Sequence, residues 1–262
     1  MKYPFFSVVV VSLNAGELMK KTMESILDQT CEDYEIIVKD GLSKDDTLQY
    51  VLNNEKIELY SESDTSIYNA MNQAIEYTKG KYVIFMNCGD TFYSNKVLEK
   101  IKEYISEEKY GMVYGDYVRN RIDVSQPVVL TPFYMYRKPI CHQSVFFNGD
   151  LLRKKYKYNE KYKIRADYDL ELRLFRKYSN LHCDVKICDY AIGGVSETKK
   201  GVEQKRIDRS EIIHNNFSKF ERIVFWIRFH ITFPKIRGWI LSDNNPEIIR
   251  KTYQKVVNLI NK

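Results

Sequence analysis

Four polar clusters directly follow four apolar runs in the first 90 residues of this chain. They are Asn14, Asp40, Glu62 with Asp64, and Asn87 with Asp90. Any one of these residues could simply cap the helix that follows its strand. In an open α/β sheet, however, the carboxyl ends of parallel strands meet at one edge, and ligands bind there. Carboxylate and amide groups gathered at such an edge can bind a metal ion or a phosphate-rich ligand.

The elements that would position these clusters alternate between strand and helix. Buried strands are predicted at 7–12, 34–39, 57–60 and 82–86, where apolar residues run together. The helical period predicts helices over 17–29 and 66–78, and Ser43 is expected to cap another helix that ends at Leu52. The alternation and the short connections predict an α/β fold. Its sheet should be mainly parallel (mixed) and flanked by helices, with right-handed crossovers.

The second half of the chain continues with both kinds of element. Strands are predicted at Tyr110–Val118, Cys141–Phe147, Leu181–Val185 and Tyr190–Ile192. Helices are predicted at Asn95–Ser106, Asp167–Tyr178 and Glu203–Lys219. Residues 119–140 hold three of the six prolines. We therefore expect an irregular segment there, lying over the site.

The positive charge gathers toward the end of the chain. Residues 199–262 hold 14 Lys and Arg against 6 Asp and Glu, a net charge of +8, so that 1–198 carries −2. We expect a near-neutral domain at 1–198 and a helical, basic-aromatic C-terminal tail at 199–262. Within the tail, 220–241 mixes Phe, Trp and Ile with Arg and Lys, which suits the interface of an anionic membrane. The alternatives for this segment are packing on the first domain or on a second copy, in a homo-oligomer.

Several classes of protein are disfavoured. No Gly-x-Gly-x-x-Gly follows the first strand and no Gly-x-x-x-x-Gly-Lys-Ser/Thr occurs, which argues against dinucleotide dehydrogenases and P-loop enzymes. The five cysteines have neither disulfide nor zinc spacing. No signal peptide or membrane-spanning run is recognisable, so we expect a cytoplasmic protein, peripheral on the inner face of the cell membrane if the tail binds there. No nucleic-acid-binding module is recognisable, and we expect no nucleic-acid partner.

The first 90 residues resemble an inverting glycosyltransferase of family 2, which has the GT-A fold. The matching motifs are Ser-Val-Val-Val-Val-Ser-Leu-Asn at 7–14, Val-Lys-Asp-Gly-Leu-Ser-Lys-Asp-Asp-Thr at 38–47, Ser-Glu-Ser-Asp-Thr-Ser-Ile-Tyr-Asn-Ala-Met-Asn at 61–72 and Met-Asn-Cys-Gly-Asp at 86–90. The third motif is the most specific, because it is similar to a signature of members that build bacterial surface polysaccharides.

The resemblance implies a nucleotide-diphosphate sugar as donor, linked to UDP. It implies that Asp40 hydrogen-bonds the nucleobase, that Asp64 lies near the base and ribose, and that Asp90 binds Mn²⁺ or Mg²⁺. The other donor-binding residues that it implies are Ser12, Asn14, Glu62, Asn69, Asn72 and Asn87. This chain departs from the family at Asn87 and Gly89, where many relatives carry carboxylates. The donor pyrophosphate would therefore have to supply further metal ligands.

The resemblance also divides the catalytic domain into two halves, a nucleotide-sugar half at 1–118 and an acceptor half at 119–198. In the acceptor half, His142 and Gln143 would face the acceptor or the diphosphate. Ser196 would do so from the loop that closes the site in the family. The alternative for His142 is an ordinary structural histidine.

The catalytic base implied by the resemblance is Asp167, at the start of a predicted helix. Family members often carry Glu-Asp here, and this chain has Ala166 in place of the Glu. A helix cap that complements the helix dipole is the alternative role for Asp167. Asp116 is the next candidate for the base.

Together these residues predict an inverting transfer from a UDP-linked sugar to a hydroxyl group. The expected acceptor is a lipid-linked molecule or an oligosaccharide in bacterial surface polysaccharide synthesis. One alternative is a nucleotidyltransferase on a related sheet, although the loop 13–16 lacks the basic residues that it would need. The other is a module that binds nucleotide sugar or membrane without catalysis, which the reduced metal motif and Ala166 leave open.

Overall fold

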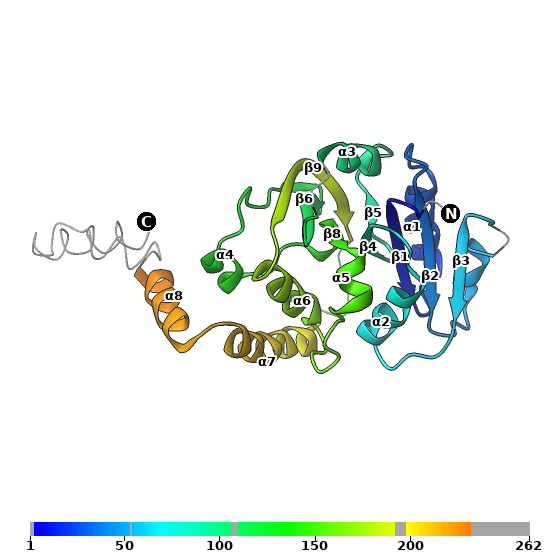
Figure 1. Cartoon of the computed structure of the whole chain (residues 1–262). Helices are drawn as coiled ribbons and strands as arrows, with labels where there is room; N and C mark the ends of the chain where they lie inside the picture. Colours follow the sequence, from blue (N-terminus) through cyan, green and yellow to red (C-terminus); the bar gives the residue numbers. More distant parts are fainter. Residues whose placement is uncertain (1–2, 53, 106–108, 192–197, 232–262) are drawn as a thin grey trace, which may run out of the picture. The chain divides into compact units, whose positions relative to one another are not determined.

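The computed structural model describes residues 3–52, 54–105, 109–191 and 198–231 (Figure 1). The chain divides into two compact units, Met1–Ile212 and Ile213–Lys262. The predicted division into domains at 1–198 and 199–262 stays a prediction. Among the described residues, no helix is both long and apolar enough to cross a membrane. All five cysteines are free thiols.

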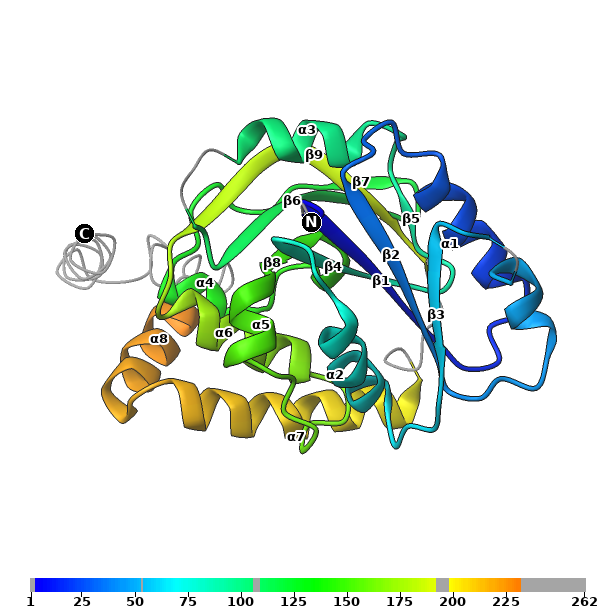
Figure 2. The same ribbon diagram turned by 45° about the vertical axis from the view of Figure 1, so that its right-hand side comes forward.

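A nine-stranded mixed sheet forms the centre of the described part of the first unit (Figure 2). Its strands are β1 Phe6–Ser12, β2 Tyr34–Asp40, β3 Ile57–Ser61, β4 Tyr82–Asn87, β5 Thr91–Phe92, β6 Met112–Arg119, β7 Ile122–Val124, β8 Val145–Asn148 and β9 Asn180–Tyr190. Their order is β3-β2-β1-β4-β8-β6-β9-β5, and β7 pairs with β6. The predicted α/β fold with a mainly parallel but mixed sheet is confirmed.

Helices cover both faces of this sheet (Figure 2). The helices of the first unit begin with α1 Glu17–Leu27, η1 Asp46–Tyr50 (a 3-10 helix), α2 Ile67–Tyr77, α3 Val97–Tyr104, α4 Pro132–Arg137, η2 His142–Ser144 (3-10), α5 Gly149–Lys154 and α6 Ala166–Phe175. Alternate residues of β1 point to opposite faces, as in any strand. Val8 and Val10 pack in one core cluster with Met23 of α1 and Leu98 of α3, all with no more than 2% of their surface exposed.

The parallel strands end level with one another at the edge that carries the polar clusters. In the register of β1 with β2, Ser12 lies beside Asp40, and in that of β2 with β3, Asp40 lies beside Ser61. Asn87, the last residue of β4, lies beside Val11 of β1. The predicted convergence of the four strand ends on one edge is therefore confirmed.

Beyond β4 the sheet turns antiparallel, because β8 runs against both β4 and β6. The strand predicted at Leu181–Val185 is confirmed as part of β9, but the predicted break before a second strand at Tyr190–Ile192 is wrong, since β9 runs without interruption over Asn180–Tyr190. Ile192 lies outside the described residues. The register of β9 with β6 shifts next to Gly115 and Asp116, which is a β-bulge. This irregularity lets β9 remain paired with β6 past the polar residues that appeared to interrupt it.

The predicted helix from Ser43 to Leu52 is also wrong. Only the 3-10 helix η1 forms there, and its cap is Asp45, whose carboxylate accepts from Thr47 N at 3.1 Å. Ser43 is turned toward Asp40 instead, since both its amide and its hydroxyl donate to that carboxylate. A local capping signal was overridden by a hydrogen bond to a buried charge.

The tail is helical as predicted, over the residues that the structure describes. The helix predicted near Glu203–Lys219 is α7, Lys199–Asn216, and a further helix, α8, covers Lys219–Ile231. Of the segment 220–241, the part after Ile231 lies outside the described residues.

The bulge beside Gly115 generates a prediction about stability. A Cβ at this position would press against the backbone carbonyl oxygens of Val185 and Cys183. Backbone atoms inside a sheet move less easily than side-chain ends, so Gly115→Ala should destabilise the protein by about 1–3 kcal/mol. Urea unfolding of the variant and the wild type measures the loss. An unchanged midpoint would mean that the bulge adapts freely.

Candidate active site

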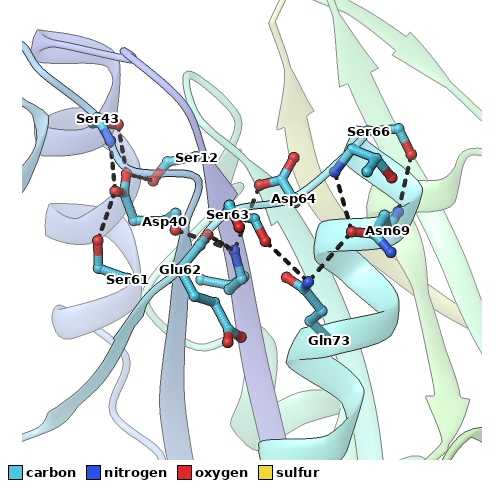
Figure 3. Close-up of polar contacts among 12 residues, drawn as sticks. Ser12, Asp40, Ser43, Ser61, Glu62, Ser63, Asp64, Ser66, Asn69 and Gln73 are labelled. Carbon is cyan, nitrogen blue, oxygen red and sulfur yellow. Dashed lines mark hydrogen bonds and ion pairs between the residues drawn. The ribbon is translucent and has the colours of Figure 1, made fainter.

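Asp40 is the centre of the polar edge at the ends of β1, β2 and β3 (Figure 3). Its side chain is completely buried. One carboxylate oxygen accepts from Ser12 Oγ at 3.0 Å and Ser43 Oγ at 2.5 Å. The other accepts from Ser43 N at 2.8 Å and Ser61 Oγ at 3.2 Å. A carboxylate accepts about four hydrogen bonds, so a nucleobase could bind Asp40 only by displacing a serine.

Asn14 connects the loops that follow β1 and β2. Its backbone lies in the left-handed region, with φ 50°, a conformation that asparagine tolerates better than most residues. Its backbone nitrogen donates to Ser43 Oγ at 2.8 Å, and its side-chain oxygen Oδ1 accepts from Lys44 N at 2.9 Å. Asn14 thus shapes the predicted donor edge through Ser43.

Glu62 and Asp64 follow β3, and both are partly exposed. The Glu62 carboxylate accepts from Tyr77 OH at 3.0 Å. Asp64 forms an ion pair with Lys39 Nζ at 3.5 Å. Sequence analysis missed Lys39, although a lysine inside an apolar strand was a usable signal, because such a group needs partners when it is buried.

Asn69 and Asn72 in α2 bind a loop of the second half of the domain. Asn72 Nδ2 donates to Tyr158 O at 3.0 Å, and Asn72 Oδ1 accepts from Tyr158 N at 2.8 Å. Both asparagines donate to the carboxylate of Glu160. In the described structure these two side chains join α2 to that loop, and their predicted role in donor binding stays a prediction.

Asp90 follows β4 and is almost completely buried. Its Oδ1 accepts from Ala191 N at 2.7 Å, just past the end of β9. Burial raises the pKa of Asp90 to about 6, although hydrogen bonds from Ala191 and from the side chain of Gln143 oppose the shift. The hydrogen bond from Ala191 to the Asp90 carboxylate joins the turn after β4 to the end of β9. The neighbouring Asn87 Oδ1 is buried and has no hydrogen-bond partner among the described residues.

A metal ion at Asp90 finds few protein ligands. Among the described residues, no group of three or more His, Cys, Asp or Glu side chains could hold one. Gly89 has φ 99°, a conformation that residues with a side chain rarely adopt, so this turn does not accommodate a second carboxylate beside Asp90. These side chains alone do not fit a metal site.

Asp167 is the second residue of α6 and is partly exposed. The helix has no side-chain cap, so the alternative that Asp167 caps α6 is wrong, although the residue does lie in its first turn. Its Oδ1 accepts from Tyr168 N at 2.8 Å and lies 3.4 Å from Tyr68 OH, whose proton is donated to Ile164 O at 2.6 Å. Burial and the charge of Asp167 raise the pKa of Tyr68 well above its usual value, so the phenol stays a donor.

His142 and Gln143 lie between the two aspartates. His142 is nearly buried, its Nε2 lies 3.3 Å from Tyr158 OH, and its Nδ1 has no hydrogen-bond partner within the described ranges. Burial lowers the pKa of His142 against the opposing charge of Asp167. The side chain of Gln143 hydrogen-bonds Asp90. The segment His142–Gln143 therefore interacts with both predicted site carboxylates, Asp167 through the charge that acts on His142 and Asp90 through Gln143.

Glu171 is a second residue that sequence analysis missed. It lies one helical turn after Asp167 in α6, fully buried. Its Oε2 accepts from Ile140 N at 3.2 Å, while Oε1 has no partner among the described residues. Burial, reinforced by the charge of Asp167, raises the pKa of Glu171 well above its usual value. The signal was available, because α6 is apolar on both sides of this acid.

Of two further predicted residues, Asp116 has partners other than the residues around Asp90 and Asp167, and Ser196 lies outside the described residues. Asp116, the second candidate for the base, accepts from Gln126 N at 2.8 Å and lies 3.2 Å from His182 Nε2. Ser196 falls in 192–197, outside the described residues. Its predicted contact with the acceptor or diphosphate stays a prediction.

Comparison with known proteins identifies similar chains. Residues 7–180 match the family described as Glycosyl transferase family 2. A PGL/p-HBAD biosynthesis glycosyltransferase of Mycobacterium tuberculosis is 28% identical over 208 residues, which cover 76% of this chain and 81% of the relative. The putative teichuronic acid biosynthesis glycosyltransferase TuaG of Bacillus subtilis is 32% identical over 119 residues, covering 44% and 47% of the two chains.

Two solved structures share the fold. S. aureus TarS in complex with UDP-GlcNAc aligns with a TM-score of 0.66 and 17% identity, over 97% of this chain and 80% of TarS. The mannosyltransferase PcManGT from Pyrobaculum calidifontis, in complex with GDP-Man and Mn²⁺, aligns with a TM-score of 0.62 and 16% identity, over 100% and 82% of the two chains. The predicted GT-A-type fold is confirmed.

Glu171→Gln tests the protonation state of the buried acid. Because the pKa of Glu171 is raised by folding, the native protein keeps a proton that the unfolded chain releases above roughly pH 4–5. Wild-type stability should therefore fall relative to Glu171→Gln as the pH rises from about 5 to 8. Thermal unfolding across this pH range measures the difference.

Asp169→Asn in the same helix is the matched control. Asp169 pairs with Arg173 Nε at 2.8 Å, so its loss should lower stability by a similar amount throughout this pH range. If the difference in stability between the wild type and Glu171→Gln is also independent of pH, then folding does not raise the pKa of Glu171.

Proposed function

The chain belongs to glycosyl transferase family 2 and is a glycosyltransferase, and on that premise we propose that it transfers a sugar from a nucleotide-diphosphate donor with inversion. The observation that carries this proposal is the position of Tyr68 OH, which donates to Ile164 O at 2.6 Å and lies 3.4 Å from Asp167 Oδ1. Tyr68 lies in α2, the helix that follows the polar edge at β3, and Asp167 begins α6. A partly exposed carboxylate is thereby joined to the half of the domain that would bind the donor.

Asp167 acts as the general base in this proposal. It takes the proton of the acceptor hydroxyl as that oxygen attacks the anomeric carbon. The bond between this carbon and the diphosphate oxygen breaks with its electron pair, so one displacement inverts the centre. Both described contacts of Asp167 use Oδ1, which leaves Oδ2 to receive the proton.

The donor edge is the row of strand ends around Asp40. A UDP-linked sugar is the proposed donor, and the complex of TarS with UDP-GlcNAc supports it. The complex of PcManGT with GDP-Man makes a GDP-linked sugar the alternative. Asp40 and Asp64 would meet the nucleoside. The unpartnered Asn87 Oδ1 and His142 Nδ1 are buried polar atoms that donor or acceptor hydroxyls could satisfy.

Dependence on Mn²⁺ or Mg²⁺ stays a prediction. The Mn²⁺ in the PcManGT complex supports it. The side chains of this protein speak against a site built from protein ligands alone, because the described residues hold no group of three or more His, Cys, Asp or Glu that could bind the ion. Most ligands of such an ion would have to come from the donor diphosphate and from water.

The acceptor is proposed from the relatives that act in biosynthesis of PGL/p-HBAD and of teichuronic acid. We propose a lipid-linked or oligosaccharide hydroxyl in the synthesis of a bacterial surface glycan. Association with an anionic membrane surface through 220–241 fits that acceptor. In α8, Phe220 is 75% exposed and Ile223 49%, and the exposed Lys219 lies next to them.

Asp167→Asn tests the base. The amide keeps the size of the side chain but cannot accept the proton, so turnover should fall by roughly 10²–10⁴-fold. Donor affinity should remain close to wild type. Transfer assays with a panel of nucleotide sugars, together with donor titration, measure both quantities. If Asp167→Asn kept near wild-type turnover and Asp116→Asn instead lost roughly 10²–10⁴-fold, Asp116 would be the base. Binding without transfer in the wild type would favour the binding-module alternative.

The membrane proposal is tested in the full chain by Phe220→Glu with Ile223→Glu. The wild type should bind vesicles that contain anionic lipid at low salt and release them as salt rises, because screening weakens the attraction. The double variant should lose most of this binding, since two acidic side chains replace the apolar groups that would enter the membrane interface. Val202→Glu, at a site 45% exposed in α7, is the control. Equal loss in the control, or no binding by the wild type, would contradict the proposal.

A further inference from the structure

We propose that Lys39 and Gly41 are positioning residues that hold the carboxylate of Asp64 in place for the nucleoside of the donor. This inference rests on the proposed function and extends it, since neither residue had been assigned a role. Three observations carry it: the contacts of the Lys39 ammonium, the space at Gly41 and the oxygen of Asp64 that remains available.

The ammonium of Lys39 is completely buried and uses all of its donors. It donates to Glu62 O at 2.7 Å, to Asp40 O at 3.1 Å and to Asp64 Oδ2 at 3.5 Å. An ammonium has three N–H groups, so these three acceptors satisfy it. Because a buried charge without partners is costly, the fold keeps Asp64 close to Lys39.

Gly41 limits the position of the same carboxylate from another side. A Cβ built on Gly41 would lie 2.6 Å from Asp64 Oδ2, which is closer than atoms can approach. The backbone does not itself require glycine here, since Gly16 and Gly89 are the glycines with positive φ in the described chain. The amide of Gly41 donates to Ser12 O at 2.8 Å, which holds this loop against β1. Glycine is therefore needed at 41 to leave room for Asp64.

The other oxygen of Asp64 is available to a ligand. The Lys39 ammonium binds Oδ2 of Asp64, and Oδ2 is also the oxygen that a Cβ at position 41 would meet. The Asp64 side chain keeps 12% of its surface exposed, and it lies beside the Asp40 edge (Figure 3). Oδ1 can therefore accept a hydrogen bond from the nucleoside, from either a ribose hydroxyl or a base N–H. It would repel a phosphate, which orients the donor with its nucleoside at this end.

Gly41→Ala is the decisive variant, because it moves Asp64 without removing any charge. The atom that must give way, Asp64 Oδ2, is the end of a flexible side chain but also a partner of the buried Lys39 ammonium, so the melting temperature should fall no further than it does in Asp64→Ala. UDP binding should weaken by about tenfold or more, the loss expected for one hydrogen bond to a charged group. Calorimetric titration of the full chain with UDP, and with GDP as a second probe, measures the dissociation constants.

Asp64→Ala provides the matched background. Without the Asp64 side chain, a methyl group added at position 41 meets no carboxylate, so adding Gly41→Ala to Asp64→Ala should cause no further loss of UDP affinity. Additive losses would overturn the inference, because they would show that the loop itself, and not Asp64, had been disturbed. Unchanged affinity in the single Gly41→Ala variant would overturn it as well.

Lys39→Met tests the second positioning residue in the same cycle with Asp64→Ala. UDP affinity should fall, and the two losses should overlap rather than add. Lys79→Met is the control for loss of an ion-paired lysine away from this edge, since Lys79, whose side chain is 49% exposed, pairs with Glu58 at 2.8 Å and Glu35 at 3.8 Å at the opposite ends of β3 and β2. Lower stability in Lys39→Met with unchanged UDP affinity would mean that Lys39 serves the fold alone. If the wild type binds neither UDP nor GDP, the proposed function fails and this inference fails with it.

Discussion

A carboxylate with no exposed surface is stable only where donors surround it, and Asp40 is in this position at the centre of the sheet edge. The groups that donate hydrogen bonds to Asp40 come from the ends of β1 and β3 and from the loop after β2. Satisfying this one charge aligns three strand ends and draws Ser43 out of the helix that it would otherwise cap. Lys39, the preceding residue of β2, places its own buried charge on the opposite face of the strand. It finds its acceptors in the same strand-end loops. The edge that would bind the donor is therefore organised before any ligand arrives.

In the second half of the domain, burial controls where protons reside. Burial raises the pKa of Glu171 well above its usual value and lowers that of His142, so it disfavours the charged form of both. The Ile140 amide binds Glu171, and Gln143, three residues on, binds Asp90. One short segment thus connects α6 to the end of β4. Asp167, partly exposed at the start of α6, is the carboxylate of this group that solvent or an acceptor can reach.

Membership of the family and the details of this chain concern different levels of structure. TarS and PcManGT share the arrangement of sheet and helices at 17% and 16% identity, so that level depends on patterns of apolar residues more than on individual side chains. Gly89, Lys39 and Glu171 belong to the other level. Each fits its place through a specific physical feature: a backbone φ of 99° at Gly89, three acceptors around Lys39, and burial that raises the pKa of Glu171.

The sequence by itself determined the architecture and the meeting of the polar strand ends at one edge of the sheet. Runs of β-branched residues at 7–12 and 34–39 predict buried strands, and parallel strands bring the residues that follow them to one edge. Tertiary structure decided what each polar side chain does there, because its partners are far away in the chain. Asn72 meets Tyr158, 86 residues on, and Asp90 meets Ala191, 101 residues on. No local pattern encodes such contacts. The single strand β9 and the raised pKa of Glu171 have the same origin, since both depend on the register and burial that the packed sheet and helices impose.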